Sequence, residues 1–326
     1  MACRWIAAGS LAAALSAGAP AVAQDYPNRP VNMVVAAAAG GPIDVFARIM
    51  AERMSPWLGQ RVVIENVGGG GGTLGAQRVA RAEPDGYTTL LGTIATHANP
   101  QLLTEKPPYD PVADFTPVAL IAEIPLILIT RKEFPASTFE EFVAYAKANQ
   151  TKMNYGSAGV GSAAHLGCVM LDRAMGTSIT HVPYRGTAPA MQDLVGGRID
   201  FLCEIAVTAV QNIKSGTVKG LANLSNLRSP VLPDLPTAVE KGLPSVQAYT
   251  WTAVFAPKGT PAPVVAKLNA ATLDAMNGPG LREQLDSLAA TLVASERRTA
   301  AYLGGFVKSE FAKWGEAIRA GGAVPK

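Results

Sequence analysis

Charge, aromatic residues, cysteine and histidine are all scarce in this chain. Of its 326 residues, 16% are charged and 6% are aromatic, and 28 Lys plus Arg face 25 Asp plus Glu. A formal net charge of +3 lacks the concentrated basic excess of a nucleic-acid binder, so we expect no nucleic-acid partner. Three Cys and three His leave few ligands for a metal cage, and we expect no metal site. With 48% hydrophobic residues the chain is not disordered, and its length indicates about two globular domains.

The first 23 residues differ in character from the rest. Arg4 precedes an uncharged run rich in Ala and Leu, and residues 21–23 read Ala-Val-Ala, which fits the small-x-small rule for cleavage. The run is too short and too interrupted to span a bilayer. We therefore predict a signal peptide over residues 1–23 and export without a lipid anchor. Cys168 and Cys203 then lie in an oxidising compartment, where they either pair or stay two buried thiols, and the sequence leaves both open.

Strand-like apolar runs alternate with helical patterns along the rest of the chain. Residues 31–35 form such a run, a glycine loop follows, and residues 44–58 place apolar side chains at helical spacing. The alternation predicts an α/β fold with mixed, mostly parallel sheets flanked by helices. Further strands are expected at 61–65, 88–91, 153–155, 179–182, 199–202, 218–222 and 249–256, further helices at 73–82, 138–148, 163–175 and 189–195, and a helical tail over 263–320 with breaks at 278–280 and 304–305.

Pro125 divides the apolar run of residues 118–130. We interpret this interruption between two short apolar runs as a crossing between domains. Residues 24–124 together with 249–326 are then expected to form lobe 1, and residues 125–248 to form lobe 2. A cleft between two lobes is a favoured place for a ligand.

Motifs of the common enzyme classes are absent. No GxSxG, HExxH, CxxC or P-loop pattern occurs. Residues 70–75 match GxGxxG and follow a predicted strand, but the strand at 88–91 ends without the carboxylate that a dinucleotide site needs. We interpret these glycines as a tight turn and expect no cofactor. The sequence therefore favours a binding protein, while a secreted α/β enzyme that uses the glycine loop or His165 with Ser162, and an exported ligand sensor, are the alternatives.

Two glycine-containing loops are suited to hold an anion. Each precedes a predicted helix, one at Asp44 and the other at Ala163. A helix start exposes unpaired N–H groups and a partial positive charge, and glycine lets the backbone approach a ligand. The sequence thus predicts a carboxylate site, although ordinary turn glycines and a capping role for Asp44 would give the same pattern.

A series of short motifs runs through the chain after residue 23. They are Tyr26-Pro27-Asn28-Arg29-Pro30-Val31, Gly40-Gly41-Pro42-x-Asp44, Gly71-Gly72-x-x-Gly75-Ala76, Pro84-Asp85-Gly86-Tyr87-Thr88, Tyr109-Asp110-Pro111, Asn154-Tyr155-Gly156-Ser157, His181-Val182-Pro183-Tyr184-Arg185-Gly186 and Leu232-Pro233-Asp234-Leu235-Pro236-Thr237. In this order they resemble the Bug (TctC) family, the periplasmic solute-binding proteins of tripartite tricarboxylate transporters. The resemblance implies a two-lobed periplasmic-binding-protein (Venus flytrap) fold that captures a carboxylated small molecule. It also implies that the protein delivers its ligand to a two-component membrane permease. We expect the protein to be a monomer.

The resemblance places the ligand in four loops between the lobes. The family's first ligand loop corresponds to residues 37–44 and its second to residues 156–162, the two segments chosen above for their glycines and helix starts. Residues 93–97 and 184–187 correspond to further cleft loops. The predicted ligand-binding residues are Ala39, Gly40, Gly41, Pro42, Ile43, Thr93, His97, Ser157, Ala158, Gly159, Val160, Gly161, Ser162, Arg185, Gly186, Thr187 and Glu204.

Departures from the family pattern bear on the choice of ligand. Val35-Ala36-Ala37-Ala38-Ala39 stands where relatives commonly have Val-Pro-Phe-x-Pro, which implies a roomier pocket. Glu204 and Ile205 stand where relatives often carry Asp-Asn, which disfavours a ligand amine as an anchor. Arg185 stands where the family commonly has Lys or Arg, and it holds a distal carboxylate or forms an ion pair at the rim. These changes favour an aromatic or other dicarboxylate.

Overall fold

The computed structural model describes residues 26–98 and 106–321. The predicted signal peptide therefore lies outside the described residues. Within them, no helix combines the length and the apolar character that crossing a membrane would require.

Within the described residues, ten strands form one hydrogen-bonded sheet. Its main path runs β2-β1-β3-β9-β4-β7-β5-β6, and β8 and β10 both pair with β4. The strands are β1 (Val31–Val35), β2 (Val62–Asn66), β3 (Thr88–Gly92), β4 (Phe115–Arg131), β5 (Asn154–Ser157), β6 (Thr180–Pro183), β7 (Phe201–Ile205), β8 (Val218–Asn223), β9 (Tyr249–Pro257) and β10 (Thr291–Leu292). Strands β1, β2 and β3 are mutually parallel, as are β5, β6 and β7, whereas β9 and β4 run antiparallel to their neighbours. The predicted α/β class with mixed, mostly parallel strands is confirmed.

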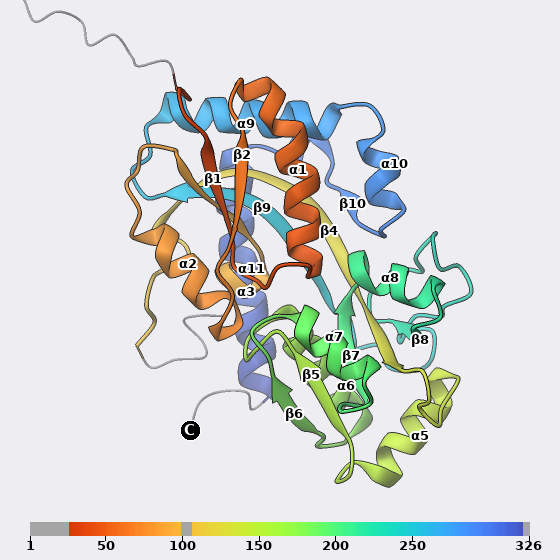
Figure 1. Cartoon of the computed structure of the whole chain (residues 1–326). Helices are drawn as coiled ribbons and strands as arrows, with labels where there is room; N and C mark the ends of the chain where they lie inside the picture. Colours follow the sequence, from red (N-terminus) through yellow and green to blue (C-terminus); the bar gives the residue numbers. More distant parts are fainter. Residues whose placement is uncertain (1–25, 99–105, 322–326) are drawn as a thin grey trace, which may run out of the picture.

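Helices cover the sheet in two groups (Figure 1). The helices are α1 (Pro42–Leu58), α2 (Thr73–Ala80), α3 (Ile94–His97), α5 (Phe139–Asn149), α6 (Ala163–Met175), α7 (Thr187–Val195), α8 (Ala206–Lys214), α9 (Ala262–Asn277), α10 (Leu281–Asp286) and α11 (Ala300–Gly321). We call β1–β3, β9 and β10 with α1–α3, α9 and α10 the first half, and β5–β8 with α5–α8 the second half. In Figure 1 the first half lies above the second, and β4 runs through both.

Strand β4 is continuous through Pro125, and the interruption of the apolar run lies where the strand passes from the first half to the second. β4 pairs with β9 as far as Pro125, opposite Tyr249, and with β7 from Leu126 onward, opposite Ile205. β9 and then β8, over residues 127–131, pair with one edge of β4, whereas β10, whose ladder ends at Glu123, and then β7 pair with the other. Proline, which has no N–H to donate, therefore lies where one set of ladders gives way to the next. The division into lobes at residues 124 and 125 stays a prediction.

The tail differs from expectation at one of its two glycine sites. α9 ends at Asn277 and α10 begins at Leu281, which confirms the break at residues 278–280. α11 in contrast runs unbroken through Gly304 and Gly305, so the second predicted break is wrong. A Cβ at Gly304 would lie 3.6 Å from Pro117 Cγ, an ordinary contact distance, because α11 packs against β4 there.

α11 is attached to the sheet through a buried carboxylate. Glu310 is only 4% exposed, yet both of its oxygens accept hydrogen bonds. Oε1 accepts from the hydroxyl of Tyr249 at 2.8 Å, and Oε2 accepts from the indole N–H groups of Trp251 at 3.1 Å and Trp314 at 3.0 Å. Such complete pairing offsets the cost of burying an acid.

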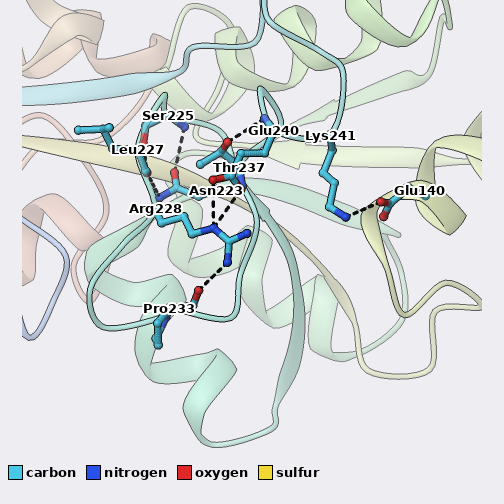
Figure 2. Close-up of polar contacts among 9 residues, drawn as sticks. All are labelled: Glu140, Asn223, Ser225, Leu227, Arg228, Pro233, Thr237, Glu240 and Lys241. Carbon is cyan, nitrogen blue, oxygen red and sulfur yellow. Dashed lines mark hydrogen bonds and ion pairs between the residues drawn. The ribbon is translucent and has the colours of Figure 1, made fainter.

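The long connection between β8 and β9 is held by polar contacts rather than by regular structure (Figure 2). The guanidinium of Arg228 donates to both oxygens of Glu240 and to the carbonyl of Pro233. Glu240 also accepts from the N–H of Thr237, and Lys241 forms a 2.6 Å ion pair with Glu140 of α5. Because most of these groups are solvent-exposed, each pair alone contributes little to the free energy of unfolding. Together the pairs define the path of the loop.

Cys168 of α6 and Cys203 of β7 form a disulfide, which decides between the two states that the sequence left open. The bond closes a loop of 35 residues inside the second half. A crosslink of this kind stabilises a domain by about 2–4 kcal/mol, mainly through the unfolded chain. Because β7 leads directly into α8, the bond also fixes the start of α8 relative to α6. Both helices begin at the same cavity.

Candidate ligand-binding cavity

A cavity lies where the carboxyl ends of parallel strands from the two halves face each other. It contains about 590 Å³ of space outside protein atoms, a volume that includes open solvent at its mouth. Loops after β1, β2 and β3 of the first half and after β5, β6 and β7 of the second half contribute to its wall, the position expected for ligands of open α/β sheets. Its lining residues are Ala36, Ala37, Gly41, Pro42, Ile43, Gly71, Leu91, Thr93, Ala95, Ala158, Ser162, Ala163, Ala164, Arg185, Thr187, Ile205 and Thr250.

The loop before α1 is held in place by Asp44. This side chain is 2% exposed, and its carboxylate accepts from the N–H of Gly40 at 2.9 Å, from Asn66 Nδ2 at 3.0 Å and from the Arg48 guanidinium at 3.0 Å. Burial alone would raise the pKa of Asp44, but these hydrogen bonds outweigh it and lower that pKa. Asp44 thus fixes the loop. The N-cap residue of α1, Gly41, has no side chain that could cap the helix amides, so the first amides of α1 stay available to a ligand.

The loop before α6 is fixed by its own side chains in a similar way. Ser157 Oγ accepts from the N–H of Gly159 at 3.0 Å and lies 2.6 Å from Nε2 of His181. Ser162 Oγ caps α6 by accepting from the N–H of His165 at 3.2 Å. Nδ1 of the His165 ring accepts from the N–H of Gly161 at 3.2 Å. The Ser162 hydroxyl and the His165 ring are therefore each used for loop structure, not paired as a nucleophile and base.

The electrostatics of the cavity favour an anion. Helices α1, α6, α7 and α8 all begin at its wall, and each contributes the partial positive charge of a helix N-terminus. Arg185 is the single charged side chain of the lining; it is exposed and forms no salt bridge among the described residues. His165 and His181 add no charge near pH 7, because burial lowers the pKa of each to about 4. The lining contains no carboxylate to oppose an anion.

The structure brings eight of the predicted site residues to the cavity wall, and four more of them support the loops. The lining contains Gly41, Pro42, Ile43, Thr93, Ala158, Ser162, Arg185 and Thr187. Ser157, Gly159, Gly161 and Gly186 lie within the same loops but do not line the cavity. Ala39 and Val160 are exposed, and Gly40 and Glu204 line a neighbouring cavity.

His97 lies away from the cavity, in the core of the first half. Its side chain is fully buried, stacks on Phe255 with ring centroids 3.7 Å apart, and has Nδ1 2.8 Å from Thr96 Oγ1. Burial lowers the pKa of His97 to about 3, so the ring is neutral. The described residues contain no group of three or more side chains arranged to hold a metal ion.

Thr250 is a lining residue that the sequence did not reveal. It lies on β9, is fully buried, and its Oγ1 has no hydrogen-bond partner among the described residues. A threonine within an apolar strand resembles an ordinary core residue. Only the position of β9 between β3 and β4 shows that this residue lies beside the cavity.

The two halves touch directly beside the cavity. Gly70, Gly71 and Gly72 all have positive φ, in agreement with a tight turn at the GxGxxG segment. A Cβ at Gly71 would overlap the carbonyl oxygen of Val160 in the second half, and one at Gly68 would lie 2.6 Å from the carbonyl oxygen of Arg185. Glycine at these two positions therefore allows the halves to meet over the cavity.

Comparison with known proteins gives a consistent result. The family model described as "Tripartite tricarboxylate transporter family receptor" matches residues 46–323. The structure of the periplasmic binding protein BugD is 41% identical, covers 92% of this chain and 100% of its own, and superposes with a TM-score of 0.89. MatC of Rhodopseudomonas palustris with bound malate is 42% identical (90% and 100% covered, TM-score 0.86). The R. palustris protein Rpa4515 with adipate is 32% identical (91% and 99% covered, TM-score 0.87).

Replacing Asp44 by Asn tests how the loop before α1 is held. The loss of a charged hydrogen-bond acceptor is expected to lower the free energy of unfolding by about 1–3 kcal/mol at pH 7. Because the pKa of Asp44 is lowered in the folded state, this difference should be complete above the ordinary Asp pKa of about 3.9 and should shrink as pH falls through the folded-state pKa. Urea unfolding from pH 7 to pH 2 measures it.

The matched control is Glu140→Gln, which breaks a solvent-exposed ion pair with Lys241. Its effect should stay below about 1 kcal/mol. An Asp44→Asn protein as stable as the wild type at pH 7, or equally destabilised at pH 7 and pH 2, would contradict the role given to Asp44.

Proposed function

We propose, because the chain belongs to the tripartite tricarboxylate transporter receptor family of periplasmic solute-binding proteins, that it captures a small dicarboxylate between its two lobes for a two-component membrane permease. Members of this family bind small carboxylates and work with membrane permeases, and the structural neighbours are binding proteins. The proposal adds the dicarboxylate class, the residues that hold it and export through a signal peptide over residues 1–23.

The observation that supports the proposal is the convergence of four helix N-termini on a cavity without an acidic side chain. One ligand carboxylate would accept hydrogen bonds from the first amides of α1 and α6, beside Ile43 and Ala163. The Thr250 hydroxyl supplies a further donor. Hydrogen bonds to a charged group contribute about 1.5–3 kcal/mol each, so four at the upper end, about 12 kcal/mol, would leave micromolar affinity, about −8 kcal/mol, after an association cost of about 4 kcal/mol.

The second carboxylate would lie at Arg185. Its guanidinium lines the cavity and is not engaged in a salt bridge among the described residues, which favours a ligand contact over a rim ion pair. The wall between the helix starts and Arg185 is apolar and includes Ala36, Leu91 and Ile205. An apolar ligand body, aromatic or aliphatic, suits this wall. The bound malate and adipate of two similar proteins are both dicarboxylates.

The permease would recognise the form in which the two lobes have closed over the ligand. A ligand that contacts both lobes favours the closed arrangement by its differential affinity for that state. The contacts of Gly71 with Val160 and of Gly68 with Arg185 would form as the lobes close.

A panel of mono- and dicarboxylates, screened by thermal shift and then by calorimetric titration, tests the ligand class. We expect a dicarboxylate with micromolar affinity and a loss of at least tenfold in Arg185→Ala. The loss should be smaller for a monocarboxylate of the same length, which has no group for Arg185 to hold. Lys152→Ala, an exposed cation at the amino end of β5 and so opposite the cavity, should bind normally. Absence of stabilisation by any acid of the panel would refute the proposal.

Gly71→Ala tests closure. The added methyl group would collide with Val160, so the variant should bind the same acid at least tenfold more weakly and should not become more compact in small-angle scattering when ligand is added. Gly70→Ala is the control, because Gly70 has a similar positive φ but its nearest neighbours, Thr73 and Leu74, lie in its own half. Equal binding by the two variants would show that the contact with Val160 plays no part in closure.

A further inference from the structure

A second cavity adjoins the first. It contains about 380 Å³ of space outside protein atoms, partly open to solvent, and it shares Gly41, Pro42 and Thr187 with the first cavity. Like the first, it lies between the halves, because Gly40–Pro42 come from the start of α1 while Glu204 and Asn212 come from β7 and α8. A ligand held by the first amides of α1 is therefore next to this space as well.

Glu204 lines this second cavity and is incompletely hydrogen-bonded. It is 1% exposed; its Oε1 accepts from the Thr208 hydroxyl at 2.7 Å, whereas its Oε2 has no hydrogen-bond partner among the described residues. The two other carboxylates of similar burial, Asp44 and Glu310, have partners on both oxygens. A buried polar atom without a partner is costly and rare, and it calls for a group that the protein itself does not supply.

The surroundings of Glu204 restrict what that group can be. The other residues of the second cavity carry no charge, and the starts of α1 and α7 lie in its wall, so their partial positive charge disfavours a ligand ammonium. Burial raises the pKa of Glu204 to about 7, although the hydrogen bond from Thr208 acts to lower it. Both protonation states are thus accessible near neutrality. A hydroxyl suits either state, since it can donate to the carboxylate and accept from the acid.

We propose that the cavity beside Glu204 is a subsite for an alcohol hydroxyl of the ligand, which makes this protein selective for hydroxylated dicarboxylates. The ligand carboxylate occupies the helix starts, and a hydroxyl on a neighbouring carbon reaches past Pro42 and Thr187 to Oε2 of Glu204. This inference rests on the proposed function and adds the ligand class within it.

Matched pairs of acids that differ by one hydroxyl test the inference. The pairs are malate with succinate, 2-hydroxyglutarate with glutarate, 2-hydroxyadipate with adipate, and 2-hydroxyterephthalate with terephthalate, titrated calorimetrically at one pH near 7.5. In the best-binding pair the hydroxylated acid should bind about tenfold more tightly, as expected for one hydrogen bond to a buried charged group. Failure of all eight acids to bind would refute the proposed function. Binding without a preference for the hydroxyl would refute only the subsite.

Two variants locate the preference in the second cavity. Glu204→Leu removes the acceptor, and the hydroxylated acid should then bind within about twofold of its partner. Ala188→Leu fills part of the same cavity while leaving Glu204 in place, so it gives the same test if Glu204→Leu does not fold. Glu310→Gln changes an equally buried glutamate on α11, outside both cavities, and should keep the tenfold preference. A preference that persists in either cavity variant would overturn the assignment.

Discussion

Unpaired amide groups at helix starts are the feature on which the rest of this structure depends. A parallel strand followed by a helix places the helix N-terminus at the carboxyl edge of its sheet. The chain repeats this arrangement in both halves, and β4 and β9 join the halves so that the two carboxyl edges face each other. Four helix starts thereby meet at one cavity, where their partial charges add without any acidic side chain in the lining. An anion is the partner that this arrangement stabilises.

The loops that carry these amides are fixed before a ligand arrives. Asp44 accepts a hydrogen bond from a backbone N–H of the loop before α1. Ser157 and Ser162 likewise accept hydrogen bonds from backbone N–H groups at the start of α6. The conformational entropy of these loops is therefore lost during folding. A small acid can then bind without a further entropic cost for ordering them. These polar groups are largely engaged within the loops, so in the proposed complex specificity would depend on Thr250, Arg185 and Oε2 of Glu204, which have no such partners among the described residues.

The parts of the fold that depend on local pattern could be predicted from the sequence. The alternation of strands and helices, the glycine loops before α1 and α6 and the start of α6 at Ala163 follow from apolar spacing and glycine placement. Gly304 and Gly305 were misjudged as a helix break, because the packing of α11 against β4 overrides the low helix propensity of glycine. His97 and Thr250 could not be assigned because strand order decides which of them lies beside the cavity.

A crystal structure of the complex with the most tightly bound acid tests the central claim most directly. The account predicts one ligand carboxylate within about 3.2 Å of the first amides of α1 and α6, with both halves closed on it. A ligand held by Arg185 alone, with the amides of both helix starts bound to solvent, would contradict it.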